Sequence, residues 1–127
     1  MKALPIFILA LLSFQSQAAS SCADKRQFQI EYSRCLDQEL EKTERELHTW
    51  ENNHLFRLQE MERSTGRGDP LRVFQRSRET FQKFSRDHCR WQYLALIPDS
   101  QAGAGVYKEC MIEQLQQQIA VMKNIRY

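Results

Sequence analysis

The chain has 127 residues, of which 42% are hydrophobic, and its 18 Lys and Arg against 16 Asp and Glu give a net charge of +2. This length allows a single domain with a modest core. The near-neutral balance predicts no strong electrostatic attraction to a partner, and the export signal described next excludes nucleic acid as a partner despite the many arginines.

The first eighteen residues have the pattern of a secretory signal peptide. Lys2 supplies a positive charge, residues 3–12 form an apolar run, and small residues surround a cleavage position after Ala18. The run is about half the roughly 20 residues that a transmembrane helix needs, and no second apolar run follows. We therefore predict that residues 1–18 are removed. Residues 19–127 would form one periplasmic or secreted helical domain, whose charge falls from +2 to +1 with the loss of Lys2.

Four cysteines remain after cleavage: Cys22, Cys35, Cys89 and Cys110. An even number of cysteines in an oxidising compartment predicts two disulfides. An alternative is that Cys22, which follows the apolar run closely, carries the lipid anchor of a lipoprotein. Ala19 stands where that signal usually has leucine, and lipidation would leave an odd cysteine, so we favour the disulfides.

Apolar side chains between residues 36 and 61 recur at alternating spacings of three and four, which predicts a long amphipathic helix. This first stripe contains Leu36, Leu40, Leu47, Trp50, Leu58 and Met61, with Thr43 and His54 at the intervening steps. The positions between them are mostly charged residues that favour helices, and acidic residues predominate.

Residues 64–70 contain two glycines and a proline, and they predict a chain reversal in which Asp69 caps a second helix that begins at Pro70. The helix should end before Pro98. Its apolar stripe is Phe74, Ser77, Phe81, Phe84, His88, Trp91 and Ala95. We expect this stripe to face the first one. Because the second segment is rich in arginine, we also expect ion pairs along the flanks of the two helices.

Residues 97–105 contain one proline, two glycines and several small residues, and this composition predicts a flexible loop. From about Val106 the pattern indicates a third helix. Its apolar side would hold Tyr107, Cys110 or Met111, Leu115, Ile119 and Met122. The predicted fold class is therefore all-α: a long antiparallel helical hairpin and a third C-terminal helix, stapled by two disulfides.

The heights of the cysteines along the helices select their pairing. With the predicted turn, Cys35 and Cys89 differ in height by roughly 13 Å at 1.5 Å per residue, whereas bridged Cα atoms lie within about 7 Å of each other. Cys89 and Cys110 lie at similar distances from the second loop, on adjacent antiparallel helices. We therefore pair Cys89 with Cys110 and, by elimination, Cys22 with Cys35. The second bridge would fold residues 28–32 back against the first helix as a short arm.

The residues do not indicate a catalytic or metal site. The histidines His48, His54 and His88 lack the spacing of metal ligands, and His54 and His88 lie on apolar stripes, where we expect them to be structural. The cysteines are used in disulfides, and the sequence has no nucleophile elbow or phosphate-binding glycine loop. We predict neither an enzyme nor a bound cofactor. Turn and helix-start chemistry explains the adhesion-like tripeptide at residues 67–69.

Three groups of residues surround the cysteines. Tyr32 and Cys35 open a glutamate-rich helix, Phe81 and Phe84 precede Cys89, and Gly103, Gly105 and Tyr107 precede Cys110. Together they resemble the lysozyme-inhibitor LprI-like family, and the resemblance spans nearly all of the chain after the signal peptide. It implies a periplasmic or surface-exposed bacterial protein that binds lysozyme and occludes the glycosidase cleft with a loop or a helix face.

An inhibitor of a glycosidase must block a cleft that holds an acid and a carboxylate. The first predicted loop offers Arg67, which can pair with a carboxylate, and Asp69. The second offers Asp99, Ser100 and Gln101 among small residues that permit close approach. The alternative function is a periplasmic interaction or chaperone-like module without lysozyme activity, which would present an exposed apolar patch to other proteins.

Overall fold

The computed structural model describes residues 21–127, so the predicted signal peptide and its cleavage site lie outside the described residues. The described chain contains a 3-10 turn, η1 (Ala23–Lys25), and three α-helices, α1 (Gln29–Thr65), α2 (Asp69–Ala95) and α3 (Ser100–Asn124). No strand occurs in this part of the chain, and none of its helices is long and apolar enough to cross a membrane. The all-α prediction is confirmed.

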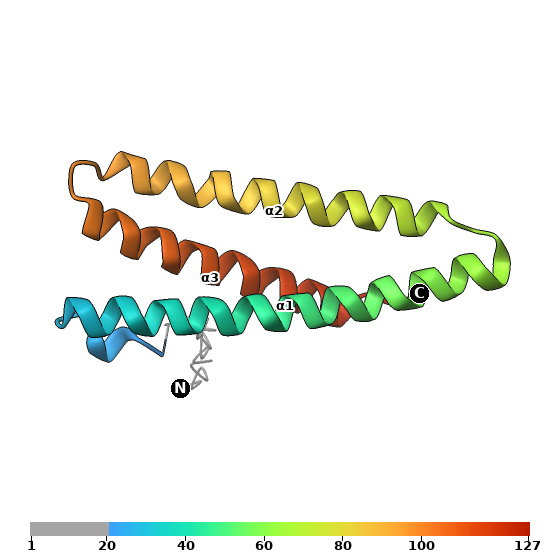
Figure 1. Cartoon of the computed structure of the whole chain (residues 1–127), viewed down its shortest axis with the longest axis horizontal. Coiled ribbons are helices and arrows are strands. Elements are labelled where there is room, and N and C mark those ends of the chain that lie inside the picture. The colour runs from blue at the N-terminus through green and yellow to red at the C-terminus, as the bar shows by residue number, and fades with distance from the viewer. Residues whose placement is uncertain (1–20) are drawn as a thin grey trace, which may run out of the picture.

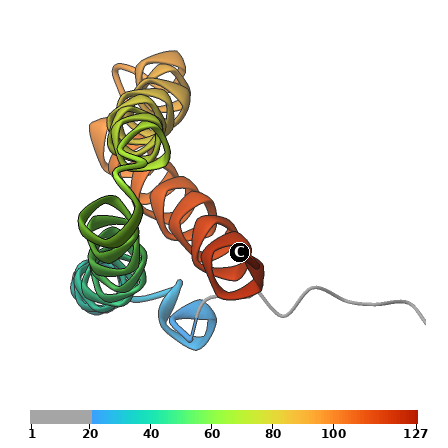
Figure 2. The same ribbon diagram turned by 90° about the vertical axis from the view of Figure 1, so that its right-hand side faces the viewer.

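The helices form an elongated bundle in which α1 and α2 make an antiparallel hairpin and α3 runs back along it (Figure 1). α1 and α2 come together near their turn and diverge away from it, and α3 packs against both (Figures 1 and 2). The expectation that the first two apolar stripes face each other is wrong for most of their length, because α3 occupies the space where the two helices diverge.

Both predicted disulfides are present. Cys22 is bonded to Cys35 with their Cα atoms 5.7 Å apart, and Cys89 is bonded to Cys110 with their Cα atoms 5.6 Å apart. Each bridge lies in a cluster of buried side chains to which α3 contributes, and a third cluster joins the middle of α1 to the end of α3. The α3 residues buried in these clusters are Cys110, Met111, Ile112, Leu115, Ile119 and Met122.

The amino-terminal arm is shorter than predicted. α1 already begins at Gln29, so Ile30 and Tyr32 lie in its first turns and not in an arm. The arm around η1 folds back instead, and the disulfide to Cys35 holds Cys22 with none of its surface exposed. The Cys22 sulfur is in this disulfide, as the prediction of two disulfides requires.

α2 has two apolar faces, and only one of them is packed. Leu71, Phe74 and Phe81 contribute to the packed face, whereas Phe84 and Trp91, which we expected there, are 56% and 59% exposed. Phe84 follows Phe81 by three residues, which places it about 60° around the helix from Phe81. That rotation carries Phe84 and Trp91 past the contact with α3, so the predicted single stripe is wrong.

The start of α2 also differs from the prediction by one residue. Gly68 occupies the N-cap position, Asp69 is the first helical residue, and no side chain caps the helix. The Asp69 carboxylate accepts a hydrogen bond from Arg72 instead. Pro70 lies within the first helical positions, as expected, because its missing N–H has no partner to lose there.

Residues 97–105 are largely helical, so the prediction of a flexible loop there is wrong. α3 begins at Ser100, and the Asp99 carboxylate caps it by accepting a hydrogen bond from the Ala102 N–H at 3.0 Å. Gly103 is buried, and a Cβ at this position would lie 2.8 Å from the ring of Tyr93 and 3.0 Å from its carbonyl oxygen. The small residues let the start of α3 lie directly against the end of α2.

We expect Gly103→Ala to destabilise the domain by about 1–3 kcal/mol, because the added methyl overpacks a contact with backbone. Gly105→Ala is the matched control, since its Cβ would have Tyr32 4.0 Å away as its nearest neighbour. That change should stabilise the domain by about 0.5–1 kcal/mol through helix propensity. Urea unfolding of both variants would measure the difference, and two changes of the same sign would contradict the close-packing explanation.

Ion pairs join the helices, although not in the arrangement expected. Arg78 of α2 pairs with Glu51 of α1 at 2.9 Å, whereas Lys108 and Lys123 of α3 pair with Asp37 and Glu46 of α1 at 2.7 and 2.8 Å. The acidic first helix therefore pairs mainly with lysines of α3, because α3 contacts α1 along more of its length than α2 does. Most of the arginines of α2 remain on the surface.

Candidate functional site

The end of the hairpin projects beyond the third helix. After α3 the chain turns onto α1, where the Arg57 guanidinium lies 4.5 Å from the Tyr127 ring centroid. The buried His54 is part of this contact: its Nε2 donates to the Met122 carbonyl at 2.8 Å, and its Nδ1 lies 2.9 Å from the Tyr127 hydroxyl. Beyond this contact, residues 59–73 form a two-helix prong (Figure 1).

Local hydrogen bonds hold the tip of the prong in one conformation. Gly66 has a φ of 73°, which suits a residue without a side chain, and its N–H donates to the Glu62 carbonyl at 2.8 Å. The Thr65 hydroxyl donates to the Met61 carbonyl at 2.7 Å and accepts from the Arg67 N–H at 3.2 Å. The turn therefore presents Arg67 from an ordered backbone.

Arg67 is exposed, and its guanidinium makes no ion pair within residues 21–127. The neighbouring arginines are engaged: Arg63 pairs with Glu60, and Arg72 pairs with Asp69. The two candidate residues of this turn thus differ. Arg67 is available to a partner, whereas Asp69 already has one within its own helix.

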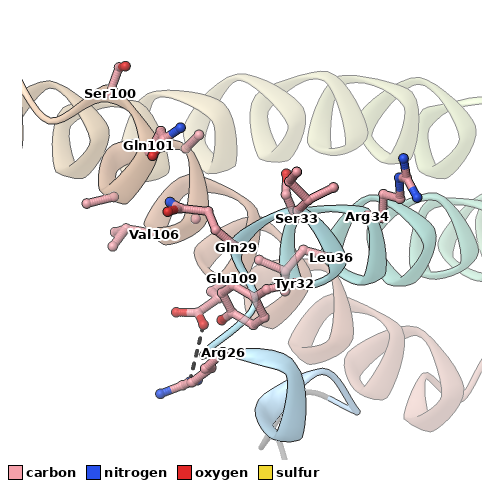
Figure 3. Close-up of a pocket in the computed structure, with 14 residues that line it drawn as sticks. Arg26, Gln29, Tyr32, Ser33, Arg34, Leu36, Ser100, Gln101, Val106 and Glu109 are labelled. Atoms are coloured by element: carbon pink, nitrogen blue, oxygen red, sulfur yellow. Dashed lines mark hydrogen bonds and ion pairs between the residues drawn. The ribbon is translucent and has the colours of Figure 1, made fainter.

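The other three candidate residues lie at the opposite end of the bundle. Asp99 caps α3, and Ser100 and Gln101 line a groove of about 660 Å³ between the start of α3 and the start of α1 (Figure 3). The structure therefore does not bring the two candidate sets together: one is on a projecting tip and the other borders a hollow.

Residues of the arm and α1 complete this groove. Arg26 pairs with Glu109 at 3.2 Å across its lower edge and lies 6.0 Å from the Tyr32 ring centroid (Figure 3). The Tyr32 hydroxyl is buried without a hydrogen-bond partner. Sequence reasoning missed Arg26 and Gln29 as lining residues, because only the fold brings the starts of two distant helices together.

One known protein family matches a region of the chain that includes both the prong and the groove. The sequence model of the family described as "Lysozyme inhibitor LprI" matches residues 20–121. The chain belongs to the LprI family. This confirms the resemblance drawn from the residues around the cysteines. No curated protein and no solved structure matches the LprI chain.

The matched region of the LprI chain includes the prong, the groove and all four cysteines. Within residues 21–127, no group of three or more His, Cys, Asp or Glu side chains could hold a metal ion. His88, half-buried on α2, stacks on Phe84 with the ring centroids 5.3 Å apart. The family is described as one of inhibitors, which is compatible with a chain that is not an enzyme.

Proposed function

We propose that this protein is exported and inhibits lysozyme by placing the tip of its prong in the glycosidase cleft. The match to the LprI family over residues 20–121 is the observation that carries this proposal. The two disulfides support an extracytoplasmic location, because such bonds persist in oxidising compartments. The predicted signal peptide supports the same location.

The shape of the prong supports its role as the inhibitory element. A cleft is concave, so the surface that fills it must project, and the prong does. Glycosidase clefts hold a pair of carboxyl groups, and the guanidinium of Arg67 can bind a carboxylate through two parallel hydrogen bonds. Because local hydrogen bonds already order the tip, little conformational entropy would be lost on binding.

The groove at the other end is less suited to this task. Ser100 and Gln101 border a hollow, and a hollow cannot fill a cleft. Asp99 is engaged as the cap of α3. These residues stay candidates for contact with a partner at the groove edge, but the proposal places Arg67 in the cleft.

We expect Arg67→Ala to weaken inhibition roughly 10- to 150-fold, the loss of about 1.5–3 kcal/mol that accompanies removal of a charged hydrogen-bond donor. Lysis of cell walls by hen-type and goose-type lysozymes, with calorimetry for binding, would measure the effect. Arg63→Ala is the matched control, because Arg63 lies beside the tip and pairs with Glu60. It should change inhibition less than threefold.

Two outcomes would overturn different parts of the proposal. If the natural protein inhibits and Arg67→Ala inhibits equally well, the prong tip is not the contact. If the natural protein neither binds nor inhibits at high micromolar concentration, the inhibitor function fails for those lysozymes.

One observation favours a second candidate function, an exported protein-interaction module. The outer face of α2 exposes large apolar side chains, among them Phe84, Trp91 and Leu94. Exposed apolar patches of this kind mark interaction surfaces in other proteins. Phe84, Trp91 and Leu94 lie outside the prong, so the two functions would use largely different surfaces of one molecule.

A further inference from the structure

The exposed side of α2 has the spacing of a helix-binding surface. Seven exposed residues on this side alternate at intervals of four and three, and we call them the outer stripe: Val73, Ser77, Thr80, Phe84, Asp87, Trp91 and Leu94. This is the heptad pattern with which one helix packs along another. All seven residues are exposed, so nothing else in the described chain covers the stripe. α3 runs along α2 without enclosing it (Figure 2).

The large members of the stripe are well exposed and hollows lie beside them. Phe84, Trp91, Leu94 and Val73 are 56%, 59%, 54% and 53% exposed. A shallow, open hollow lies on each side of Phe84, one toward Val73 and the other toward Trp91. Side chains of a partner helix could enter these hollows in the way that knobs fill holes in a coiled coil.

A row of basic residues runs along one flank of the stripe. Arg76, Lys83 and Arg90 are exposed, follow one another at seven-residue intervals, and directly precede Ser77, Phe84 and Trp91. None of the three basic residues forms an ion pair within residues 21–127. In coiled coils the residues at this position select the partner by charge.

We propose that the outer stripe binds an amphipathic helix of another protein, one with apolar residues at heptad spacing and acidic residues along the facing flank. This deepens the second candidate function and does not depend on lysozyme inhibition. The His88 ring already stacks on Phe84 and meets Trp91 edge to face, with centroid separations of 5.3 and 6.5 Å, so binding immobilises few new rotamers.

A second copy of the chain is a poor occupant. In an antiparallel pair of α2 helices the basic flanks would face each other, and like charges at these positions oppose pairing. In a parallel pair each basic residue would face Phe81, His88 or Ala95, none of which is acidic. Asp87 in the middle of the stripe needs a hydrogen-bonding partner when it is covered, which a side chain of a partner helix can supply and the acyl chains of a lipid surface cannot.

The test uses two synthetic helical peptides that share leucines at heptad spacing, with one asparagine in the seam to meet Asp87, and that differ only in their flanks, one with Glu and one with Lys. Fluorescence polarisation against the full mature protein should show the Glu peptide binding at least tenfold more tightly. The triple variant Arg76→Glu, Lys83→Glu, Arg90→Glu should reverse that preference. Phe84→Ala with Trp91→Ala should weaken binding at least tenfold, whereas the control Phe56→Ala, at a 61% exposed position of α1, should not.

Several results would overturn the proposal. They are equal affinity for the two peptides, no reversal in the triple variant, binding that survives loss of both aromatic residues, a dimer by sedimentation, or stronger binding to phosphatidylglycerol vesicles than to the Glu peptide. Circular dichroism would confirm that each variant is folded. A lysozyme assay of the Phe84→Ala, Trp91→Ala variant keeps the two functions separate, because the prong predicts unchanged inhibition.

Discussion

Replacing Arg78 by methionine is expected to destabilise the domain by about 3–5 kcal/mol, the cost of leaving a buried charge without its partner. Glu51 is 2% exposed, and one of its carboxylate oxygens is bonded to Arg78 at 2.9 Å while the other has no hydrogen-bond partner. Without the Arg78 guanidinium, the buried Glu51 carboxylate would lose its ion-pair partner. Urea unfolding followed by circular dichroism would measure the loss.

The double variant Glu51→Leu, Arg78→Met separates the cost of the stranded charge from the loss of the pair itself. Replacing both members of a buried ion pair with apolar residues is often neutral or stabilising. We therefore expect the double variant to recover most of the stability lost by Arg78→Met. A single variant that costs less than about 1 kcal/mol, the range of exposed pairs, would show that water screens this contact.

Loss of the Cys89–Cys110 disulfide is expected to cost about 3 kcal/mol. The bond spans 21 residues and joins α2 to α3, and Cys89 has none of its surface exposed. The Cys89→Ser, Cys110→Ser variant would raise the conformational entropy of the unfolded chain. It would also place two hydroxyls in an apolar cluster with Met111. Guanidinium unfolding of the oxidised variant would show a lower midpoint.

The Cys22→Ser, Cys35→Ser variant provides the comparison. This bond spans 13 residues and ties only the arm to α1. Without this bond the arm can fray while the three helices stay packed. Loss of the bond therefore increases the conformational entropy of the folded state nearly as much as that of the unfolded state. We therefore expect a smaller shift of the main transition. A larger loss than that of the Cys89–Cys110 variant would mean that the arm is needed to hold α1 against α3.

The disulfide pairing could be predicted because it depends on distance along helices, and helices have a fixed rise per residue. The early start of α3 could not. Gly103 and its small neighbours have the composition of a loop, and their role as a close contact with Tyr93 appears only when α2 and α3 are placed side by side. Small residues serve flexible turns and tight helix packing equally well.

The exposed side of α2 was misjudged for a related reason. Phe74 and Phe81 fit a helical stripe, and so do Phe84 and Trp91. Each step of three or four residues changes the direction of a side chain around the helix axis, so a series of such steps can pass from one face of the helix to the next. The position of the third helix decides which face is buried, and the pattern of α2 does not contain that information. The location of Arg67 at an end of the molecule was easier to predict, since a glycine turn between two long helices must lie there, and its contact with a partner stays a prediction.

The 37-residue length of α1 affects how the protein behaves in solution. At 1.5 Å per residue α1 is about 55 Å long, whereas a sphere with the radius of gyration of a compact domain of this size, about 13 Å, is only about 34 Å across. A rod of these proportions tumbles unevenly and elutes from a sizing column ahead of spherical proteins of equal mass. Its elution volume would therefore overestimate its mass, and its mass in solution needs a method that does not depend on shape.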